Sequence, residues 1–455
     1  MTTESRATLR SLSEDLASGK TSARKLTELC LARISDPKGE GARAFISVDK
    51  QGALLAADAQ DALRRANATG SAFAGIPIAI KDLADIKGQI TRAGSTALAE
   101  AAPAVADAPV VARLRAAGFV IIGRANMTEF AYSGLGLNPH YGTPSSPWDR
   151  NGKRVPGGSS SGSGVAVADG FAYGALGTDT GGSCRIPAAF NGVVGYKPTA
   201  RRVPTDGVVP LSTSLDSIGP LARTVACAHA MDAVMAGEMP GKPLQPMQLG
   251  GLRLFVPETT VLDGLDRHVA ADFDRTLALL SKAGARVMRG KFAAFERIPA
   301  MVRKGGLSAS ESHAWHRELL ATKGNQYDPR VRTRIMMGER QSSADYIDLL
   351  NARRAAIAAY DAGLTSYDAI VSPTIPVVAP RIADCQTDDD YNRNNMAVLR
   401  NTLMINIFDG CSIALPMMRP GEAPTSLMVS APAMADQRLF AIAAAVEGAL
   451  GRGAA

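Results

Sequence analysis

Serine and glycine gather in two short stretches of the 455-residue chain. The first reads PGGSSSGSG at 156–164, and the second reads GTDTGGSCRIP at 177–187. Glycine lacks a Cβ, so such stretches permit a positive φ and let backbone N–H groups converge on a small anion or an oxyanion. A serine in such a loop becomes a nucleophile only when a positioned base accepts its proton. The two stretches therefore indicate anion binding or nucleophilic catalysis.

Two common loop types match the first stretch only in part. Gly157 and Gly162 have the separation of a phosphate-binding loop, but Ser163 follows where that loop requires lysine. The G-x-S-x-G pattern of a nucleophile elbow is met with Ser160 at its centre. An elbow follows a buried strand, however, and residues 149–154 are typical of a loop. A nucleotide site and an elbow nucleophile are therefore the weaker alternatives.

A lysine at the end of a predicted strand, Lys81, completes a third arrangement, in which the chain resembles the amidase signature family. The matching segments are GIPIAIKDL at 75–83, NMTEF at 126–130, PGGSSSGSG at 156–164, GTDTGGSCRIPAAFNGVVGYKPT at 177–199, DSIGP at 216–220 and SPT at 372–374. Two family serines lie 24 residues apart, as Ser159 and Ser183 do here. The resemblance covers nearly the whole chain and is loosest over 240–365.

The resemblance implies a catalytic relay of three residues. Ser183 would attack the substrate carbonyl, Ser159 would pass on the proton, and Lys81 in its neutral form would be the general base. Lysine can accept a proton near neutral pH only when burial or a nearby dipole lowers its pKa well below about 10.4. The family also holds the relay serine after a cis peptide bond, here Gly158–Ser159. Taken singly, the lysine fits a solvated strand end and each serine fits a turn; jointly they indicate hydrolysis.

The same resemblance implies an oxyanion hole and no metal or organic cofactor. The oxyanion hole would consist of the backbone N–H groups of Thr180, Gly181, Gly182 and Ser183. The five histidines offer no metal frame, because His313 and His316 lie three residues apart on a predicted helix without a third ligand. We expect that histidine pair on the surface.

Three neighbours of Ser183 receive supporting roles in this interpretation. Asp179 and Arg185 flank the serine, and we expect them to form a hydrogen-bonded or ionic network rather than to transfer protons. Cys184 stands where the family commonly has an apolar residue, so a packed thiol is expected. Ser161 replaces a glycine of many family members and leaves the relay serine untouched.

The relay does not choose among amides, anilides and carbamates, because all three present a planar carbonyl to the same acyl-enzyme chemistry. The residues that match the family's pocket wall are Phe130, Ala131, Tyr132 and Ser133. Their character predicts an apolar to aromatic acyl or leaving group, although Phe130 fits a core position equally well. The expected partner is a small-molecule amide or carbamate, such as a urethane, and a homodimer is left open.

The family also includes the amidase subunit of the RNA-dependent amidotransferase, which works within a complex that makes glutaminyl- or asparaginyl-tRNA. That alternative predicts a partner-bound protein directed at glutamine. The pocket-wall segment AYSGLG at 131–136 is small and apolar, as in stand-alone amidases, and favours the free enzyme. The net charge of +7 gives nucleic-acid binding little support, because the basic residues occur in pairs and never in a run of five.

The elements that must position these residues follow from the apolar pattern. Between about 75 and 237, short apolar runs alternate with helical segments, which is typical of a sheet covered on both faces. We expect an α/β fold, and the resemblance implies a single amidase-signature domain over 1–455, with a central mixed β-sheet and a helical covering subdomain. Its predicted divisions are N-terminal helices at 1–66, a catalytic core at 67–237, the covering subdomain at 238–366 and a C-terminal return to the core at 367–455.

Individual elements are predicted from residue spacing and from capping residues. The predicted helices span 8–34 with a break at 18–21, 50–65 and 436–450, and the predicted strands span 76–80, 120–122 and 369–372. Thr21 or Ser22 would cap the second helix, which also accounts for an isolated serine–lysine pattern at Ser22 and Lys25.

Composition predicts a globular cytoplasmic protein. Hydrophobic residues make up 46% and charged residues 20%, so burial can offset chain entropy. The first 25 residues are polar and charged, and no apolar run reaches the roughly 18 residues of a bilayer span. We therefore expect neither export nor membrane insertion. Five scattered cysteines form no C-x-x-C pair, so reduced thiols are expected.

Overall fold

One large sheet organises the chain in the computed structural model, which describes residues 7–238 and 243–451. The strands within these residues are β1 (Phe45–Val48), β2 (Pro77–Lys81), β3 (Val120–Ala125), β4 (Gly174–Thr178), β5 (Val194–Lys197), β6 (Ile218–Ala222), β7 (Arg253–Pro257), β8 (Arg286–Gly290), β9 (Ala369–Pro373), β10 (Cys411–Pro416) and β11 (Ser426–Ala431). They form a single sheet in the order β1-β3-β2-β4-β6-β5-β10-β11-β9-β7-β8.

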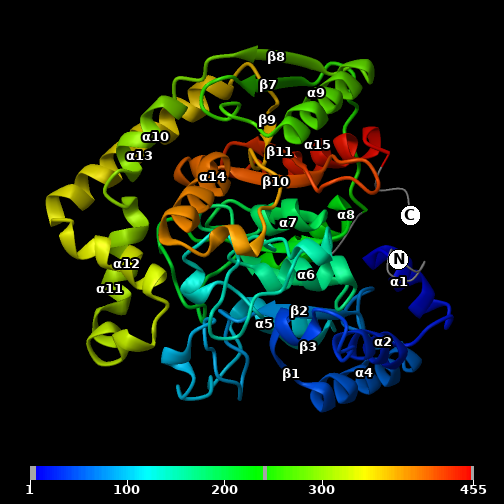
Figure 1. The fold of residues 1–455 in the computed structure, drawn as a ribbon. Coiled ribbons are helices and arrows are strands. Elements are labelled where there is room, and N and C mark those ends of the chain that lie inside the picture. Colours follow the sequence, from blue (N-terminus) through cyan, green and yellow to red (C-terminus); the bar gives the residue numbers. More distant parts are fainter. Residues whose placement is uncertain (1–6, 239–242, 452–455) are drawn as a thin grey trace.

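The α-helices pack around this sheet (Figure 1). Over the described residues they are α1 (Leu9–Ala17), α2 (Ala23–Ile34), α3 (Gly41–Ala44), α4 (Lys50–Arg65), α5 (Pro109–Ala116), α6 (Ser161–Asp169), α7 (Arg185–Asn191), α8 (Val225–Ala236), α9 (Arg267–Lys282), α10 (Ile298–Val302), α11 (Gly306–Lys323), α12 (Pro329–Met336), α13 (Ser343–Leu364), α14 (Asp388–Ile407) and α15 (Asp436–Ala449).

The sheet combines parallel and antiparallel pairs. β2 runs parallel to β3 and β4, and β7 runs parallel to β8 and β9. The central strands β6, β5, β10 and β11 are joined to their neighbours by antiparallel pairing. The predicted α/β fold, a single domain with a central mixed sheet flanked by helices, is confirmed.

Local signals in the sequence placed several elements correctly. α1 and α2 are separated at the predicted break, and the Ser22 side chain caps α2 by accepting a hydrogen bond from the Lys25 amide. α4 has the predicted bounds, and β9 and α15 begin at the predicted residues. The apolar runs of β2 and β3 are buried along their whole length, as strands covered on both faces must be.

The structure differs from the predicted covering subdomain at 238–366. Residues 253–290 form β7, α9 and β8, which extend the sheet beyond β9. These strands escaped prediction because the apolar run of β7 is short and β8 has no fully buried residue. Within the described part of 238–366, the helical cover consists of α10 to α13, which lie together along one side of the molecule (Figure 1).

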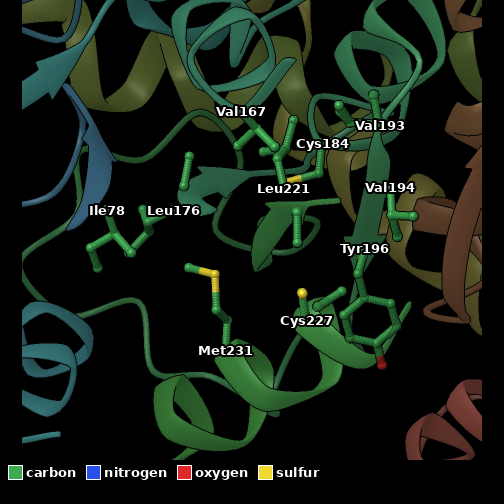
Figure 2. Packing of buried hydrophobic residues seen from close by; sticks show 14 of the residues in the cluster. Ile78, Val167, Leu176, Cys184, Val193, Val194, Tyr196, Leu221, Cys227 and Met231 are labelled. Carbon is green, nitrogen blue, oxygen red and sulfur yellow. The ribbon is translucent and has the colours of Figure 1, made fainter. Parts of the chain in front are cut away.

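The largest hydrophobic cluster of the described residues joins strands of the sheet to the helices that cover them. Figure 2 shows part of it, where Ile78 of β2, Leu176 of β4 and Met231 of α8 lie in one region. The five cysteines are all free and buried, as expected of reduced thiols.

Gly219 of β6 marks a close approach of two backbones within the sheet. A Cβ at this position would lie 1.9 Å from the carbonyl oxygen of Tyr196 in β5. Both strands are paired on their other sides, β6 with β4 and β5 with β10, so neither can move away freely. This constraint explains the glycine of the DSIGP segment at 216–220.

We predict that Gly219→Ala destabilises the fold by about 3 kcal/mol or more, because the added methyl group forces a backbone shift. Gly250→Ala is the matched control, since a Cβ there meets no atom within 4 Å. Thermal unfolding followed by circular dichroism is expected to give a lower Tm for the Gly219 variant alone. Equal Tm values for the two variants would contradict the close approach.

Candidate active site

The carboxyl ends of two neighbouring parallel strands bring the first site residues together. Lys81 is the last residue of β2 and Thr178 is the last residue of β4. The Lys81 Nζ donates hydrogen bonds to Thr178 Oγ1 at 2.7 Å and to Ser159 Oγ at 2.8 Å. Lys81 and Ser159 are both fully buried. The strand topology thus places the predicted base beside the predicted relay serine.

Lys81 has an environment that favours its neutral form. Burial lowers the pKa of Lys81 from its ordinary 10.5 to about 7, although the carboxylates of Asp179 and Asp216 act in the opposite direction. Asp179 is paired with Arg185, and Asp216 accepts a hydrogen bond from a threonine hydroxyl. Near neutral pH, about half of the molecules therefore carry an amine that can accept a proton.

The segment that carries Ser159 is fixed on both sides. The Gly158–Ser159 peptide bond is cis, as the resemblance implied. The Ser159 carbonyl accepts a hydrogen bond from the Thr128 amide at 3.0 Å. Ser160 precedes α6 as its N-cap residue, and its amide donates to the Ser183 carbonyl at 3.3 Å. This last bond joins the two stretches rich in serine and glycine directly.

Ser183 follows a glycine that no other residue could replace. Gly182 has a φ of 132°, and a Cβ there would lie 2.2 Å from Thr402 Oγ1 of α14. Ser183 is 4% exposed and lies two residues before the start of α7, with Cys184 as the N-cap residue between them. The paired glycines of TDTGGS therefore let the turn that carries Ser183 lie against α14.

Cys184 is directed away from this turn into the hydrophobic core. Figure 2 shows its side chain beside Leu221, within the same cluster as Val167. Its Sγ donates a weak hydrogen bond of 3.5 Å to the Gly219 carbonyl. Burial raises the pKa of the Cys184 thiol well above its ordinary range. The predicted packed thiol is confirmed.

Asp179 holds the turn around Ser183 from the inside. Its carboxylate accepts hydrogen bonds from the amides of Gly182 at 2.8 Å and Cys184 at 3.0 Å. The same carboxylate forms an ion pair with Arg185 at 2.9 Å, and both side chains are fully buried. Burial by itself would raise the pKa of Asp179, but the pairing with Arg185 outweighs it and holds that pKa well below its usual range. The predicted ionic network is therefore present.

The backbone amides predicted for the oxyanion hole differ in whether they already donate a hydrogen bond. The Gly182 amide already donates to Asp179. In the described part of the chain, the amides of Thr180, Gly181 and Ser183 donate to no other group. Three N–H groups on this turn are therefore free to meet an anionic oxygen.

Comparison with known proteins agrees with this geometry. The family model described as Amidase matches residues 25–440. The chain belongs to the amidase family. It is 38% identical over 417 residues to 2-amino-5-chloromuconic acid deaminase from Comamonas testosteroni. The matched region covers 90% of this chain and 89% of that protein. It is 33% identical to a glutamyl-tRNA(Gln) amidotransferase subunit from Salinispora arenicola (strain CNS-205), with 96% of each chain covered.

A crystal structure of an amidase has the same fold as this chain. The two agree with a TM-score of 0.87 at 31% identity, over 97% of this chain and 99% of the other. The resemblance stated from the sequence is thereby confirmed. This amidase is a hydrolase that acts on carbon–nitrogen amide bonds.

The predicted pocket wall begins with two residues of positive φ, Phe130 at 48° and Ala131 at 60°. The Phe130 side chain is 1% exposed, and its ring centroid lies 4.4 Å from that of His316 and 4.9 Å from that of Tyr327. Of the two alternatives open for Phe130, the structure places it in a core position. The prediction of a surface site is wrong for His316, because the Phe130 and Tyr327 rings bury it completely.

The next two residues of the wall contact the neighbouring helices. The guanidinium carbon of Arg334, on α12, lies 4.7 Å from the centroid of the Tyr132 ring. The Ser133 hydroxyl donates a hydrogen bond of 3.0 Å to Asn395 Oδ1 of α14. The wall is therefore closed from outside by the cover and by α14.

A cavity of about 160 Å³ lies between this wall and the end of β4. Its lining includes Ala131 from the wall, Thr178 and Thr180 from the β4 side, and Asp216 from the loop that precedes β6. Of the four residues predicted to bind substrate, Ala131 is the one that lines this space. The cavity therefore borders both the hydroxyl partner of Lys81 and the turn that carries Ser183.

The sequence did not single out Thr178 or Arg334. Thr178 could have been found, because a hydroxyl side chain at the end of a buried strand next to β2 has few other partners for its polar group. Arg334 belongs to no recognisable motif, and it contacts Tyr132 from α12, an element distant in the sequence.

Over residues 7–238 and 243–451, no group of three or more His, Cys, Asp or Glu residues is arranged to hold a metal ion. Among the helices of those residues, none has both the length and the apolar character that a membrane crossing requires.

Proposed function

We propose that this amidase hydrolyses aryl or alkyl amides, anilides or carbamates through an acyl-enzyme on Ser183, with Lys81 and Ser159 as its proton relay. The observation that carries the proposal is the buried contact of 2.8 Å between Lys81 Nζ and Ser159 Oγ, together with a lysine pKa of about 7. A neutral amine within hydrogen-bond reach of a hydroxyl is what general-base catalysis requires. A cytoplasmic location and the absence of a nucleic-acid partner belong to the same proposal.

Acylation moves protons along the relay. Ser183 Oγ forms a bond to the carbonyl carbon while its proton passes to Ser159, and the Ser159 proton passes to Lys81. The carbonyl oxygen becomes an oxyanion, and the unused amides of Thr180, Gly181 and Ser183 are the donors available to it.

Collapse of the tetrahedral intermediate then breaks the carbon–nitrogen bond. The leaving nitrogen takes a proton back through Ser159, and an amine or ammonia departs while an ester remains on Ser183. Water attacks the ester carbon by the same route, which releases the acid and restores the hydroxyl. Water is the only co-reactant that the balance requires.

Arg334 favours a substrate that carries a carboxylate. Its guanidinium lies over Tyr132 of the pocket wall, and no carboxylate of the described residues forms an ion pair with it. A half-buried guanidinium can bind a carboxylate through charge-assisted hydrogen bonds. The relative with 38% identity is named as a deaminase of an acid, 2-amino-5-chloromuconic acid. We therefore place amides that carry a carboxylate first among the substrates.

The alternative function is that of the amidase subunit of an RNA-dependent amidotransferase. The identity of 33% to an amidotransferase subunit supports it, whereas the small, apolar segment at 131–136 favours a free enzyme. A stable partner that copurifies with the chain, and glutamine turnover only in its presence, would favour the subunit. Turnover of an anilide by the isolated chain would favour the free enzyme.

We predict that Ser183→Ala abolishes labelling by a fluorophosphonate probe, because the nucleophile is removed. We also predict that Lys81→Ala slows hydrolysis by about a hundredfold to ten-thousandfold, the usual contribution of a general base. Mass spectrometry of the labelled peptide and turnover of 4-nitroacetanilide measure the two effects. The exposed Lys87 lies in the same segment, so Lys87→Ala is the control and is expected to behave as wild type. Labelling at Ser160 or Ser22 instead of Ser183 would overturn the mechanism.

We predict that the rate constant for labelling Ser183 rises with pH and reaches half of its plateau near pH 7. Below that pH the Lys81 amine is protonated and cannot accept a proton, whereas above it the amine is neutral. At pH 6 the rate is expected to be about a tenth of its plateau. Labelling reactions quenched at a series of times, between pH 5 and pH 9, measure how this rate constant depends on pH. A rate constant that does not change with pH would exclude Lys81 as the base.

We predict that Arg334→Gln raises the KM for an anilide with a terminal carboxylate by roughly tenfold or more, the effect of losing a charge-assisted hydrogen bond. The KM for the neutral 4-nitroacetanilide is expected to stay unchanged. N-(4-nitrophenyl)succinamic acid is a suitable acidic substrate, and exposed Arg332→Gln on the same helix is the control. An equal effect on both substrates would show that Arg334 supports the wall without binding a carboxylate.

A further inference from the structure

A line of hydrogen bonds leads from the helical cover into the catalytic core. It begins at Glu311 of α11, whose carboxylate accepts hydrogen bonds from Ser212 Oγ at 2.5 Å and from the Ser214 amide at 3.0 Å. The hydroxyls of Ser214 and Tyr346 donate to the other oxygen of the same carboxylate at 2.5 Å and 2.9 Å. Glu311 thus attaches the loop that precedes β6 to two helices of the cover, α11 and α13.

The line continues through the same loop to a second carboxylate. The Ser212 amide donates to Asp216 Oδ2 at 3.1 Å, and the Leu211 amide donates to that oxygen at 3.0 Å. The other oxygen, Asp216 Oδ1, accepts a hydrogen bond of 2.5 Å from the hydroxyl of Thr180. Ser212 therefore joins two carboxylates, one from the cover and one beside the turn that carries Ser183.

The start of this turn is held by the same loop at a second place. The Asp179 amide donates to the Ser217 carbonyl at 2.7 Å, and the Ser217 hydroxyl donates to the Asp179 carbonyl at 2.8 Å. Later in the same turn, the Asp179 carboxylate accepts hydrogen bonds from the amides of Gly182 and Cys184. Thr180 and Gly181 lie between these two fixed points, and the hydroxyl bond to Asp216 is the side-chain contact that fixes Thr180.

We infer that Asp216 is a positioning residue for the oxyanion donors of this amidase, and that Glu311 links the docking of the helical cover to it through Ser212. The inference rests on the proposed function, because it assigns Thr180 and its neighbours to the oxyanion hole. Neither carboxylate meets the reacting atoms. Each acts through the position of the Thr180 backbone, whose amide donates to no group in the described chain and is free for the oxyanion.

This arrangement has a kinetic consequence. Oxyanion donors stabilise the charged tetrahedral state more than the neutral ground state, so a displaced donor lowers kcat and leaves KM nearly unchanged. Loss of folded protein would also lower the apparent kcat at constant KM, so kcat is expressed per molecule whose Ser183 is labelled to completion by the fluorophosphonate probe. The cover would therefore affect the chemical step although its helix α11 lies outside the relay.

The test compares Asp216→Asn, Glu311→Ala and Glu311→Gln with wild type in the turnover of 4-nitroacetanilide. Asp216→Asn and Glu311→Ala are expected to lower kcat by roughly tenfold to a hundredfold, the scale of a displaced catalytic group, with KM nearly constant. Glu311→Gln keeps an oxygen and an NH₂ group for the three hydroxyls and is expected to recover most of the loss. Glu318→Ala, an exposed carboxylate on the same helix, is the matched control.

Hydrogen exchange of the 179–184 amides gives a second readout that needs no turnover. These amides are expected to exchange faster in Glu311→Ala than in wild type or Glu318→Ala. If Glu311→Ala does not fold, Ser212→Ala takes its place, because it removes only the hydroxyl that binds Glu311 and keeps the amide that binds Asp216. Unchanged kcat and unchanged exchange in these variants would overturn the inference while wild-type turnover and Ser183 labelling stand. Loss of wild-type labelling at Ser183 would instead overturn the proposed function.

Discussion

The burial of an amine without a carboxylate partner is the constraint on which this site depends. Lys81 faces the hydroxyls of Ser159 and Thr178, and its removal from water lowers its pKa to about 7. Asp179 and Asp216 both favour the ammonium form of Lys81, but the effect of burial outweighs them. Arg185 also balances the charge of Asp179 in a fully buried ion pair. The pair can therefore order the turn after β4 without fixing a proton on Lys81.

Strand direction explains why these groups meet at one edge of the sheet. β2 and β4 are parallel, so Lys81 and Thr178 end side by side. β6 is antiparallel to β4 with Thr178 opposite Ile218, so the residues that precede β6 face those that follow β4. This register places Asp216 beside Thr180. The DSIGP and TDTGGS segments are thus two sides of one structure, although they lie far apart in the sequence.

The sequence was sufficient to predict features that depend on a local pattern of residues or on a dense motif. Capping at Ser22, the bounds of α4 and the contact of Lys81 with Ser159 belong to that class. Prediction from the sequence failed where contacts between distant segments determine whether a residue is buried or a segment forms a strand. The burial of His316 depends on the Phe130 ring, which comes from a different part of the chain. The short strand β7 pairs with β9, which follows it by many residues, and β8 pairs in turn with β7.

Buried carboxylates bind the helical cover to the core through hydrogen bonds. One carboxylate belongs to the core and accepts from the cover, and another belongs to the cover and accepts from the core. Glu129 of the core is fully buried and accepts a hydrogen bond of 2.7 Å from the amide of Asp328, the residue before α12. Glu311 of the cover reaches in the opposite direction to Ser212. A buried carboxylate that loses such donors incurs a large desolvation cost, so these bonds favour one docked position over alternatives. Since Glu129 also precedes Phe130 directly, the cover and the pocket wall are positioned by the same contacts, and neither can shift without the other.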